Sequence, residues 1–365
     1  MRGTAGNKSV QKAKHKILTG SRTTSKTKAK TGRTEVVKPF YIAGVGASAG
    51  GINAVSELLS QFTPAMHVAV LIVIHLSKAV MGDIIVARLQ KNTSLPCKIA
   101  EDNEIIKPGN IYLAPPDAHL LVKENRLLVG HGPAENRFRP SIDVLFRSMA
   151  VNHGEKAIGI ILTGFLNDGT SGMLAIKESG GHCIVQDPNE AEYPDMPLSV
   201  AETLNVDHCV SLKQMGKIIL EISKIEKVKG VLPPRKVVAE SRISEKAATG
   251  IEEISKLGEK SVFACPDCGG GLWSIRNGHV KHYRCHIGHA YSEKDLVVKQ
   301  SETIENTLWV AIRMMEERKT MLWKLAAEND LRGLGRISTT YREQSEQLKI
   351  HIEKLKEWLM AHHFE

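Results

Sequence analysis

The stretch Phe40-Tyr-Ile-Ala-Gly-Val-Gly46-Ala-Ser48-Ala-Gly50-Gly51 decides the fold. Its first half is apolar and predicts a buried strand over 40–45 that ends in glycines. Those glycines permit a sharp turn, and the spacing of apolar residues over 52–59 then predicts a helix. A continuous apolar strand that turns directly into a helix is typical of a mostly parallel sheet whose two faces are both covered.

The same alternation continues outward to residue 225. Apolar runs predict further strands over 68–74, 111–114, 158–162 and 183–186. Helical spacing predicts helices over 83–89, 141–150 and 172–178. The runs 119–122 and 126–129 flank Lys-Glu-Asn and predict a hairpin. The predicted fold class is therefore α/β, a doubly wound and mostly parallel sheet over residues 39–225.

The positive charge of the chain is concentrated at one end. Residues 1–38 hold eleven Lys and Arg and one Glu, a net charge of +10, whereas the whole chain carries +9. This segment has too few apolar residues for a core, so we expect a disordered, solubilising tail. Nonspecific contact with nucleic acid or anionic lipid fits its charge too, but no specific nucleic-acid site is predicted. This segment lacks the apolar stretch of a secretory signal peptide. The longest apolar run of the chain, 68–74, is too short to span a membrane, so we expect a cytoplasmic protein.

Three further segments follow the α/β region. Residues 226–260 are rich in Lys, Glu and Ser and contain Pro233-Pro234, which predicts a linker. Residues 261–292 hold a cluster of cysteines and histidines. Residues 293–365 show two apolar stripes separated by Gly333-Leu-Gly335, which predicts a helical hairpin or a helix pair that binds a partner.

The cysteine spacing in the second of these segments predicts a metal site. Cys265-Pro-Asp-Cys268 is followed, after sixteen residues, by Cys285-His286-Ile-Gly-His289. Cys265, Cys268, Cys285 and His289 form a closed set that suits structural Zn²⁺. His286 as the fourth ligand, and free thiols without a metal, remain open alternatives. Because a closed set leaves no vacant position, we expect no catalytic role for this metal, and no cofactor for catalysis.

Reactive side chains follow three of the predicted strands. Ser48 follows the first strand, His75 follows the strand over 68–74, and Asp168 lies a few residues beyond the strand over 158–162. The carboxyl ends of parallel strands meet at one edge of a sheet, where ligands bind. A serine needs a base, and the base needs an orienting carboxylate, so these residue types together predict a Ser-His-Asp triad.

Alternative interpretations exist for this region. Ser48 and Asp168 could each only cap a helix, and His75 could be a buried histidine without a catalytic role. Gly44, Gly46 and Gly50 also resemble a dinucleotide-binding turn, but that site requires an acid at the end of the next strand, where His75 stands.

Several ordered segments resemble one known family. They are Gly46-Ala-Ser48-Ala-Gly-Gly51, Ile72-Val-Ile-His75, Leu113-Ala-Pro-Pro-Asp117-Ala-His119, Arg139-Pro-Ser-Ile-Asp143-Val-Leu-Phe-Arg147, Leu162-Thr-Gly-Phe-Leu-Asn-Asp168-Gly and Met196-Pro197. Their order, over roughly residues 40–220, resembles that of the CheB-type protein-glutamate methylesterases. Residues 261–292 resemble the zinc-ribbon-like tail of some homologues without a receiver domain, which implies a docking or regulatory module.

The resemblance implies a function and roles for the site residues. It implies hydrolysis of glutamyl methyl esters, and deamidation of glutamines, on the cytoplasmic helices of chemotaxis receptors. Ser48 would be the nucleophile, His75 the base and then the acid, and Asp168 the orienting carboxylate. The backbone N–H groups of Phe165 and Ala49 would bind the oxyanion. A cognate methyltransferase or signalling protein is a further implied partner.

The chain also departs from the family pattern. Ala49 replaces a frequent Thr, Phe165-Leu166 replaces Met-Gly, and Leu198-Ser199 replaces Arg-Glu. Residues 1–38 are too short and too basic for the receiver domain that many members carry, so we expect another means of regulation. The alternative function is a scaffold or sensor that retains the fold and acts through its zinc and helical modules.

Overall fold

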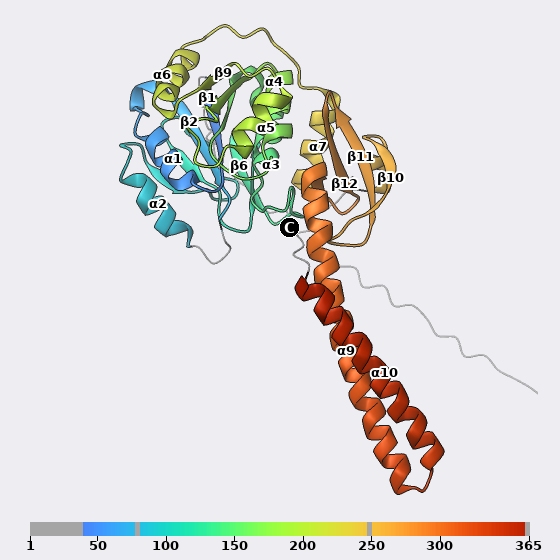
Figure 1. Ribbon diagram of the computed structural model, residues 1–365. Helices are drawn as coiled ribbons and strands as arrows, with labels where there is room; N and C mark the ends of the chain where they lie inside the picture. The colour runs from blue at the N-terminus through green and yellow to red at the C-terminus, as the bar shows by residue number, and fades with distance from the viewer. Residues whose placement is uncertain (1–38, 77–80, 247–249, 362–365) are drawn as a thin grey trace, which may run out of the picture. The chain divides into compact units, whose positions relative to one another are not determined.

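A seven-stranded, entirely parallel sheet forms the centre of the α/β region in the computed structural model (Figure 1). The structure describes residues 39–76, 81–246 and 250–361, so the predicted basic tail lies outside the described residues. In spatial order the strands are β3 (Cys97–Ile99), β4 (Ile111–Leu113), β2 (Val68–Ile74), β1 (Tyr41–Ala47), β7 (Ala157–Ile161), β8 (His182–Gln186) and β9 (His208–Val210). The strand order runs in opposite directions on the two sides of β1, so the predicted doubly wound fold is confirmed.

Helices cover both faces of this sheet. One apolar cluster joins the sheet to α3 (Ile142–His153), α4 (Thr170–Glu178) and α5 (Asp195–Thr203). The other joins it to α1 (Gly51–Leu59), α2 (Gly82–Gln90) and α6 (Leu212–Ser223). The predicted hairpin is present as β5 (His119–Lys123) and β6 (Arg126–Gly130). Short 3-10 turns occur at η1 (Pro64–Met66) and η2 (Gly154–Lys156).

The glycines of β1 allow α3 to pack closely on the sheet. A Cβ atom at Gly44 would lie 2.5 Å from Sδ of Met149, and one at Gly46 would lie 2.5 Å from Cγ2 of Ile142. Side chains at these positions would therefore push α3 away from the sheet. The close packing of α3 therefore accounts for Gly44 and Gly46 without a bound dinucleotide.

The segment expected to be a linker differs from that expectation, because it contains helices. These are α7 (Arg235–Lys246), which packs against α3, and α8 (Ile251–Ser255). The buried positions of α7 include Glu240 and Ser241 beside Val237 and Ile243. Since half of these buried residues are polar, the apolar spacing of a helix is not visible in the sequence.

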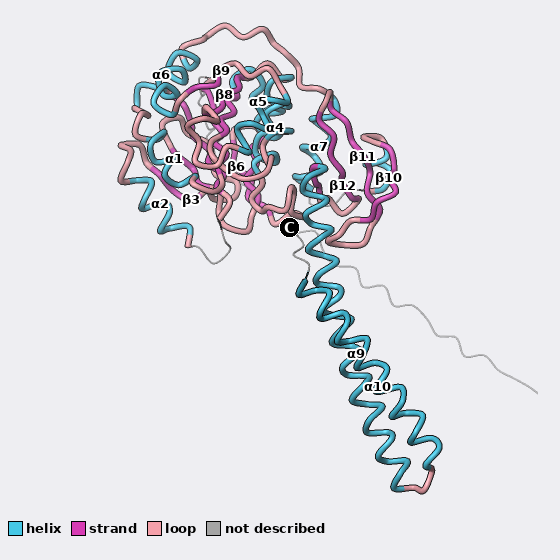
Figure 2. Tube along the Cα trace, in the orientation of Figure 1, coloured by secondary structure: helices cyan, strands magenta, loops and turns pink. Residues whose placement is uncertain are grey.

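The remaining elements are a small sheet and two long helices. The sheet is antiparallel and consists of β10 (Glu259–Ala264), β11 (Gly271–Asn277), β12 (Val280–Cys285) and β13 (Ala290–Ser292). The helices α9 (Glu293–Leu331) and α10 (Gly335–Ala361) lie side by side as a hairpin (Figure 2). Ile312, Ile352 and Leu359 form the buried seam between them, as the apolar stripes predict for packing within the chain. None of the helices among the described residues has the length and apolar character needed to cross a membrane.

Candidate active site

Ser48 lies at the carboxyl end of β1, in the turn that leads into α1. Its backbone N–H donates to the carbonyl oxygen of Thr163 at 3.0 Å, which ties the turn to the residues after β7. Gly50 has φ +71°, a conformation that favours glycine, and α1 begins at the next residue. A pocket of about 220 Å³, lined in part by Ser48, Ile52 and Arg88, opens beside the serine.

His75 lies next to Ser48 because of the strand register. Ala47 pairs with Ile74 in the parallel sheet. Ser48 and His75 are the next residues along these two strands, so they leave the sheet at the same level. The backbone N–H of His75 also donates to the carbonyl oxygen of Ala47 at 3.0 Å. Its ring stacks on Phe138, with the ring centroids 3.6 Å apart and the planes 6° from parallel.

The two nitrogens of the His75 ring have different surroundings. Nε2 lies 2.8 Å from Oδ2 of Asp168. Nδ1 is buried and has no hydrogen-bond partner among the residues that the structure describes. Asp168 thus engages one ring nitrogen and leaves the other, Nδ1, for a different contact.

Asp168 is 1% exposed, and its carboxylate accepts several hydrogen bonds. Oδ2 accepts from His75 and from the backbone N–H of Ile142 at 2.7 Å. Oδ1 accepts from Asn136 Nδ2 at 2.9 Å and from Ser141 Oγ at 2.9 Å. The backbone N–H groups of Asp143 and Gly169 add bonds of 3.2 and 3.0 Å to Oδ1. The carboxylate is therefore fixed in one orientation.

The N-terminus of α3 supplies part of the positive field at this carboxylate. The cap position of α4 is Gly169, without a side-chain cap, so Asp168 does not have the simple capping role on α4 that was an alternative. Burial acts to raise the pKa of Asp168, but hydrogen bonding and charge from His75, together with the bonds from Asn136 and Ile142, lower it below its usual range. Asp168 thus remains a carboxylate beside the imidazole.

A second buried carboxyl group, Asp143, lies beside the first. It accepts from the backbone N–H of Gly172 at 2.6 Å and from Asn136 Nδ2 at 2.7 Å. Burial, followed by the charge of Asp168, raises the pKa of Asp143 to about 7. The two environments move the pKa values of the two carboxyl groups in opposite directions, so that Asp168 is the ionised one.

The residues after β7 face the serine at close range. A Cβ atom at Gly164 would lie 2.7 Å from Cβ of Ser48, so only glycine fits there. The backbone N–H groups of Phe165 and Ala49 donate to no residue that the structure describes, which leaves them open to a ligand. Leu166 has φ +66°, a left-handed conformation in which a Cβ atom is strained.

The cysteine cluster forms a compact set of four ligand atoms, all within 4.8 Å of one another, from Cys265, Cys268, Cys285 and His289. Cys268 Sγ lies 3.8 Å from Cys285 Sγ, and His289 Nδ1 lies 3.5 Å from Cys285 Sγ. Tetrahedral Zn²⁺ with Zn–S bonds of about 2.3 Å places two sulfurs ~3.8 Å apart. A hydrogen bond from Cys285 is the main cause that lowers the pKa of the Cys265 thiol, which favours the thiolate form that binds a metal. The donor set and its dimensions fit zinc, with His289 rather than His286 as the nitrogen ligand.

The structure brings His75 and Asp168, two of the three predicted site residues, into contact and places Ser48 at the neighbouring strand end. The sequence predicts no role for Asn136, Phe138 or Asp143. Asp143 lies within the segment 139–147 that carries part of the family resemblance, so a signal existed for it. Asn136 and Phe138 lie in an irregular loop without periodicity, and nothing in the sequence pointed to them.

Serine, histidine and carboxylate side chains at the carboxyl edge of a parallel sheet define a class, the α/β proteins equipped for serine-hydrolase chemistry. Residues 43–219 match the family model of the CheB methylesterase. A putative protein-glutamate methylesterase/protein-glutamine glutaminase of Leptospira interrogans is 38% identical over 181 residues, which cover 49% of this chain and 93% of that protein. The chain therefore belongs to the CheB methylesterase family.

Two other comparisons each cover about half of the chain. The protein-glutamate methylesterase/protein-glutamine glutaminase of Escherichia coli is 36% identical over 183 residues, which cover 49% of this chain and 52% of that protein. The crystal structure of the Thermotoga maritima CheB methylesterase catalytic domain is 27% identical, with a TM-score of 0.48, over 50% of this chain and 98% of that one.

Proposed function

We propose that this protein hydrolyses glutamyl methyl esters, with Ser48 as nucleophile, His75 as general base and acid, and Asp168 as the orienting carboxylate. The observation that carries the proposal is the 2.8 Å contact between His75 Nε2 and Asp168 Oδ2, beside the strand end that presents Ser48. The names of the relatives describe carboxylic ester hydrolases. Hydrolysis of a carboxylic ester is a reaction that a serine, histidine and carboxylate triad performs.

The reaction proceeds in two halves. His75 Nδ1 accepts the proton of the Ser48 hydroxyl as Oγ attacks the ester carbonyl carbon, and the protonated ring then delivers that proton to the departing methoxide. Methanol leaves, and an acyl ester on Ser48 remains. His75 next accepts a proton from water as the water attacks this ester, and it returns the proton to Ser48 Oγ as the glutamate carboxyl group leaves. A glutamine side chain would pass through the same acyl ester and release ammonia.

Two backbone donors suit the tetrahedral intermediate. Ala49 follows Ser48 in the turn after β1, and Phe165 lies in the loop after β7. The hydrogen bond from the Ser48 N–H to the Thr163 carbonyl oxygen joins these two loops. Donors fixed in place before the reaction stabilise a developing oxyanion without reorganisation. We therefore assign the oxyanion site to Phe165 and Ala49.

The substrate that the family resemblance implies is a methylated chemotaxis receptor. Its modified glutamates lie on cytoplasmic helices, so the protein would act in the cytoplasm, together with a methyltransferase or a signalling protein of the same pathway. We propose that Cys265, Cys268, Cys285 and His289 bind a structural Zn²⁺. Since all four positions are protein ligands, the ion would hold the small β-sheet together and leave catalysis to the triad.

The test is methanol release from methylated receptor fragments, with wild type compared with Ser48→Ala. Release by the wild type and its loss in the variant support the proposal. Release that survives the substitution rejects Ser48 as nucleophile. No release by the zinc-loaded wild type from several receptors would favour the alternative, a scaffold that retains the fold without the activity.

A further inference from the structure

A short turn over residues 135–138 contacts two members of the proposed triad. Asn136 Nδ2 donates to Asp168 Oδ1 at 2.9 Å, and the Phe138 ring lies flat against the ring of His75. The turn thus limits the movement of both the carboxylate and the imidazole. It belongs to neither a strand nor a helix, so its position depends on what packs against it.

The conformation of this turn is strained. Glu135 and Phe138 bond to each other through their backbones, at 3.2 and 3.0 Å. Between them Asn136 has φ +50° and Arg137 has φ +70°. Consecutive left-handed residues other than glycine are unfavourable, so a turn of this kind needs external contacts to persist.

The C-terminal module, defined here as residues 259–302, supplies such contacts. The backbone N–H of Asn136 donates to the carbonyl oxygen of Ala290 at 2.8 Å, and the N–H of Ser292 donates to Asn136 Oδ1 at 3.2 Å. Asn136 is therefore bonded to the module through its backbone and its side-chain oxygen, and to Asp168 through its side-chain nitrogen. Arg137 also forms an ion pair with Glu302 of α9.

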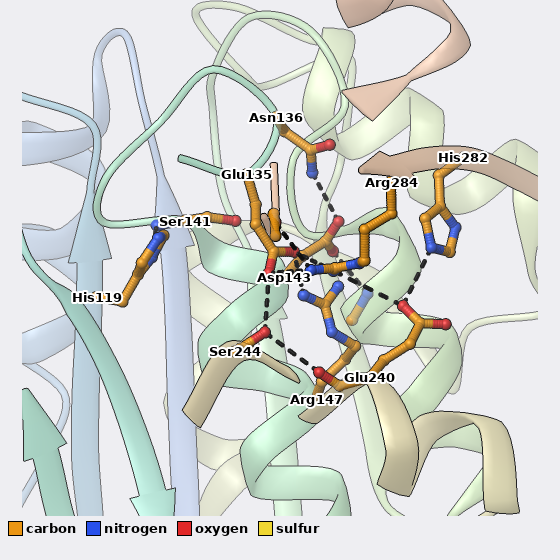
Figure 3. Close-up of polar contacts among 12 residues, drawn as sticks. His119, Glu135, Asn136, Ser141, Asp143, Arg147, Glu240, Ser244, His282 and Arg284 are labelled. Atoms are coloured by element: carbon orange, nitrogen blue, oxygen red, sulfur yellow. Dashed lines mark hydrogen bonds and ion pairs between the residues drawn. The ribbon is translucent and has the colours of Figure 1, made fainter. Parts of the chain in front are cut away.

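A buried ion network fixes Glu135, the first residue of the turn (Figure 3). Glu135 is 2% exposed, and Arg284 of β12 binds it with two hydrogen bonds of 2.9 and 2.7 Å. Arg147 of α3 pairs with the same carboxylate, and Ser244 Oγ of α7 donates to it at 2.8 Å. Two guanidinium groups on one buried carboxylate keep it ionised, and they join the module, α7 and the catalytic region at one point.

We propose that the C-terminal module positions the catalytic triad through this turn, with Asn136 and Phe138 as positioning residues and Arg284 as the anchor that holds them. The inference deepens the proposed function and rests on it. Arg284 is adjacent to Cys285, and Ala290 is adjacent to His289, so the contacts on the turn begin at neighbours of the proposed zinc ligands. Loss of order in the metal cluster would therefore be transmitted to Asp168 and His75.

The first experiment measures the rate at which a fluorophosphonate labels Ser48 in the full chain. Wild type is compared with Asn136→Ala and with Asn152→Ala as a matched control. Asn152 of α3 also bonds backbone groups through its side chain, but these are Val122 O of β5 and Glu124 N just after it, outside the turn. We expect Asn136→Ala to slow labelling on the order of 10- to 100-fold, and Asn152→Ala to leave it within about twofold. Equal rates for wild type and Asn136→Ala would overturn the inference.

A second measurement separates positioning from general stability. The proton between His75 and Asp168 gives a low-field NMR signal when the contact is formed. We expect this signal to shift or disappear in Asn136→Ala while the other resonances show a folded chain. An unchanged signal together with slow labelling would reject a positioning role. If the wild type itself is never labelled, the proposed function fails, which is a different result from equal labelling of both proteins.

The anchor is tested by Arg284→Met and Arg284→Lys. The methionine variant removes both bonds to Glu135, whereas lysine restores a charge without the paired geometry. We expect labelling to be slow in Arg284→Met and partly restored in Arg284→Lys, with the melting temperature of the α/β region little changed. If Arg284→Met unfolds, the folded Arg284→Lys variant decides: wild-type labelling and an unchanged low-field signal there would overturn the role of the anchor.

Discussion

The backbone N–H of Ile142, the first residue of α3, donates to Oδ2 of Asp168 at 2.7 Å, and the same oxygen lies 2.8 Å from His75 Nε2. A helix terminus and the imidazole of His75 thus share one carboxylate. This arrangement predicts that Asp168 has two separable roles. It stabilises the fold by accepting backbone hydrogen bonds, and it orients the histidine.

Asp168→Asn should impair both roles. The amide turns an NH₂ group toward donors that need an acceptor, so we expect the free energy of unfolding to fall by about 3 kcal/mol. Because the imidazole loses its charged partner, the rate of ester hydrolysis should fall on the order of 10³- to 10⁴-fold. Urea unfolding and methanol release measure the two effects.

Asp207→Asn is the matched control for this substitution. Asp207 also accepts a backbone hydrogen bond, from Cys183 at 2.8 Å, and pairs with Lys177, but it lies away from the site. It should lose some stability and retain hydrolysis. Equal hydrolysis by Asp168→Asn and Asp207→Asn would contradict the assignment of Asp168.

Gly164→Ala should displace the nucleophile. The new Cβ atom would overlap Sδ of Met196 and lie 2.7 Å from Cβ of Ser48. The end of the flexible Met196 side chain can move aside, whereas Cβ of Ser48 is fixed to the backbone and cannot rotate away. A small displacement of a reacting group costs on the order of 100-fold in rate, so we expect a loss of that order in fluorophosphonate labelling. Gly130→Ala, where no atom lies within 4 Å of the added group, should label like wild type. Wild-type labelling of Gly164→Ala would show that the turn is more tolerant than its packing indicates.

Much of the site could be predicted from the sequence because it depends on strand ends. Continuous apolar runs locate β1, β2 and β7, and parallel pairing then brings the residues after them to one edge. Ser48, His75 and Asp168 follow from this rule alone. The cysteines and histidine that could hold a metal are also visible in the sequence, since their spacing is local to a short segment.

The rest depends on contacts between distant parts of the chain. Asn136 is fixed by Ala290 and Ser292, more than 150 positions away, and no local pattern encodes that pairing. The helix α7 was missed because its buried face includes Glu240, whose partner His282 is likewise far away in sequence. Buried polar pairs replace the apolar periodicity on which sequence analysis depends.

At position 166, glycine should give a more stable protein than alanine, which is the reverse of their usual order. With φ +66°, any residue with a Cβ atom is strained there, by roughly 1 kcal/mol. Leu166→Gly and Leu166→Ala both remove the half-buried side chain, but only glycine also removes the strain. We therefore expect the glycine variant to be more stable than the alanine variant by about 1 kcal/mol in urea unfolding. If alanine were the more stable, as it is at ordinary helical and strand positions, the left-handed conformation would be contradicted.

Asp143 should make stability depend on pH. Burial and the charge of Asp168 raise its pKa to about 7, so the folded chain holds this proton more tightly than the unfolded chain does. Its stabilising contribution is complete below the ordinary carboxyl range and is lost as the pH rises through about 7. Asp143→Asn should remove this decline from a series of urea unfolding curves, whereas the exposed control Asp83→Asn should retain it. A decline that is equal in both variants would assign it to another group.

Substitution of one cysteine of the cluster should release the metal. Cys268 is exposed, so Cys268→Ser removes a proposed ligand with little loss of packing, and Cys209→Ser is the matched control at an exposed cysteine outside the cluster. Elemental analysis should find about one zinc per chain in the wild type and in Cys209→Ser, and much less in Cys268→Ser. Because binding of a structural metal contributes directly to folding, the small β-sheet should also become more accessible to protease in Cys268→Ser alone. Equal zinc content in the two variants would mean that the cluster does not hold the ion.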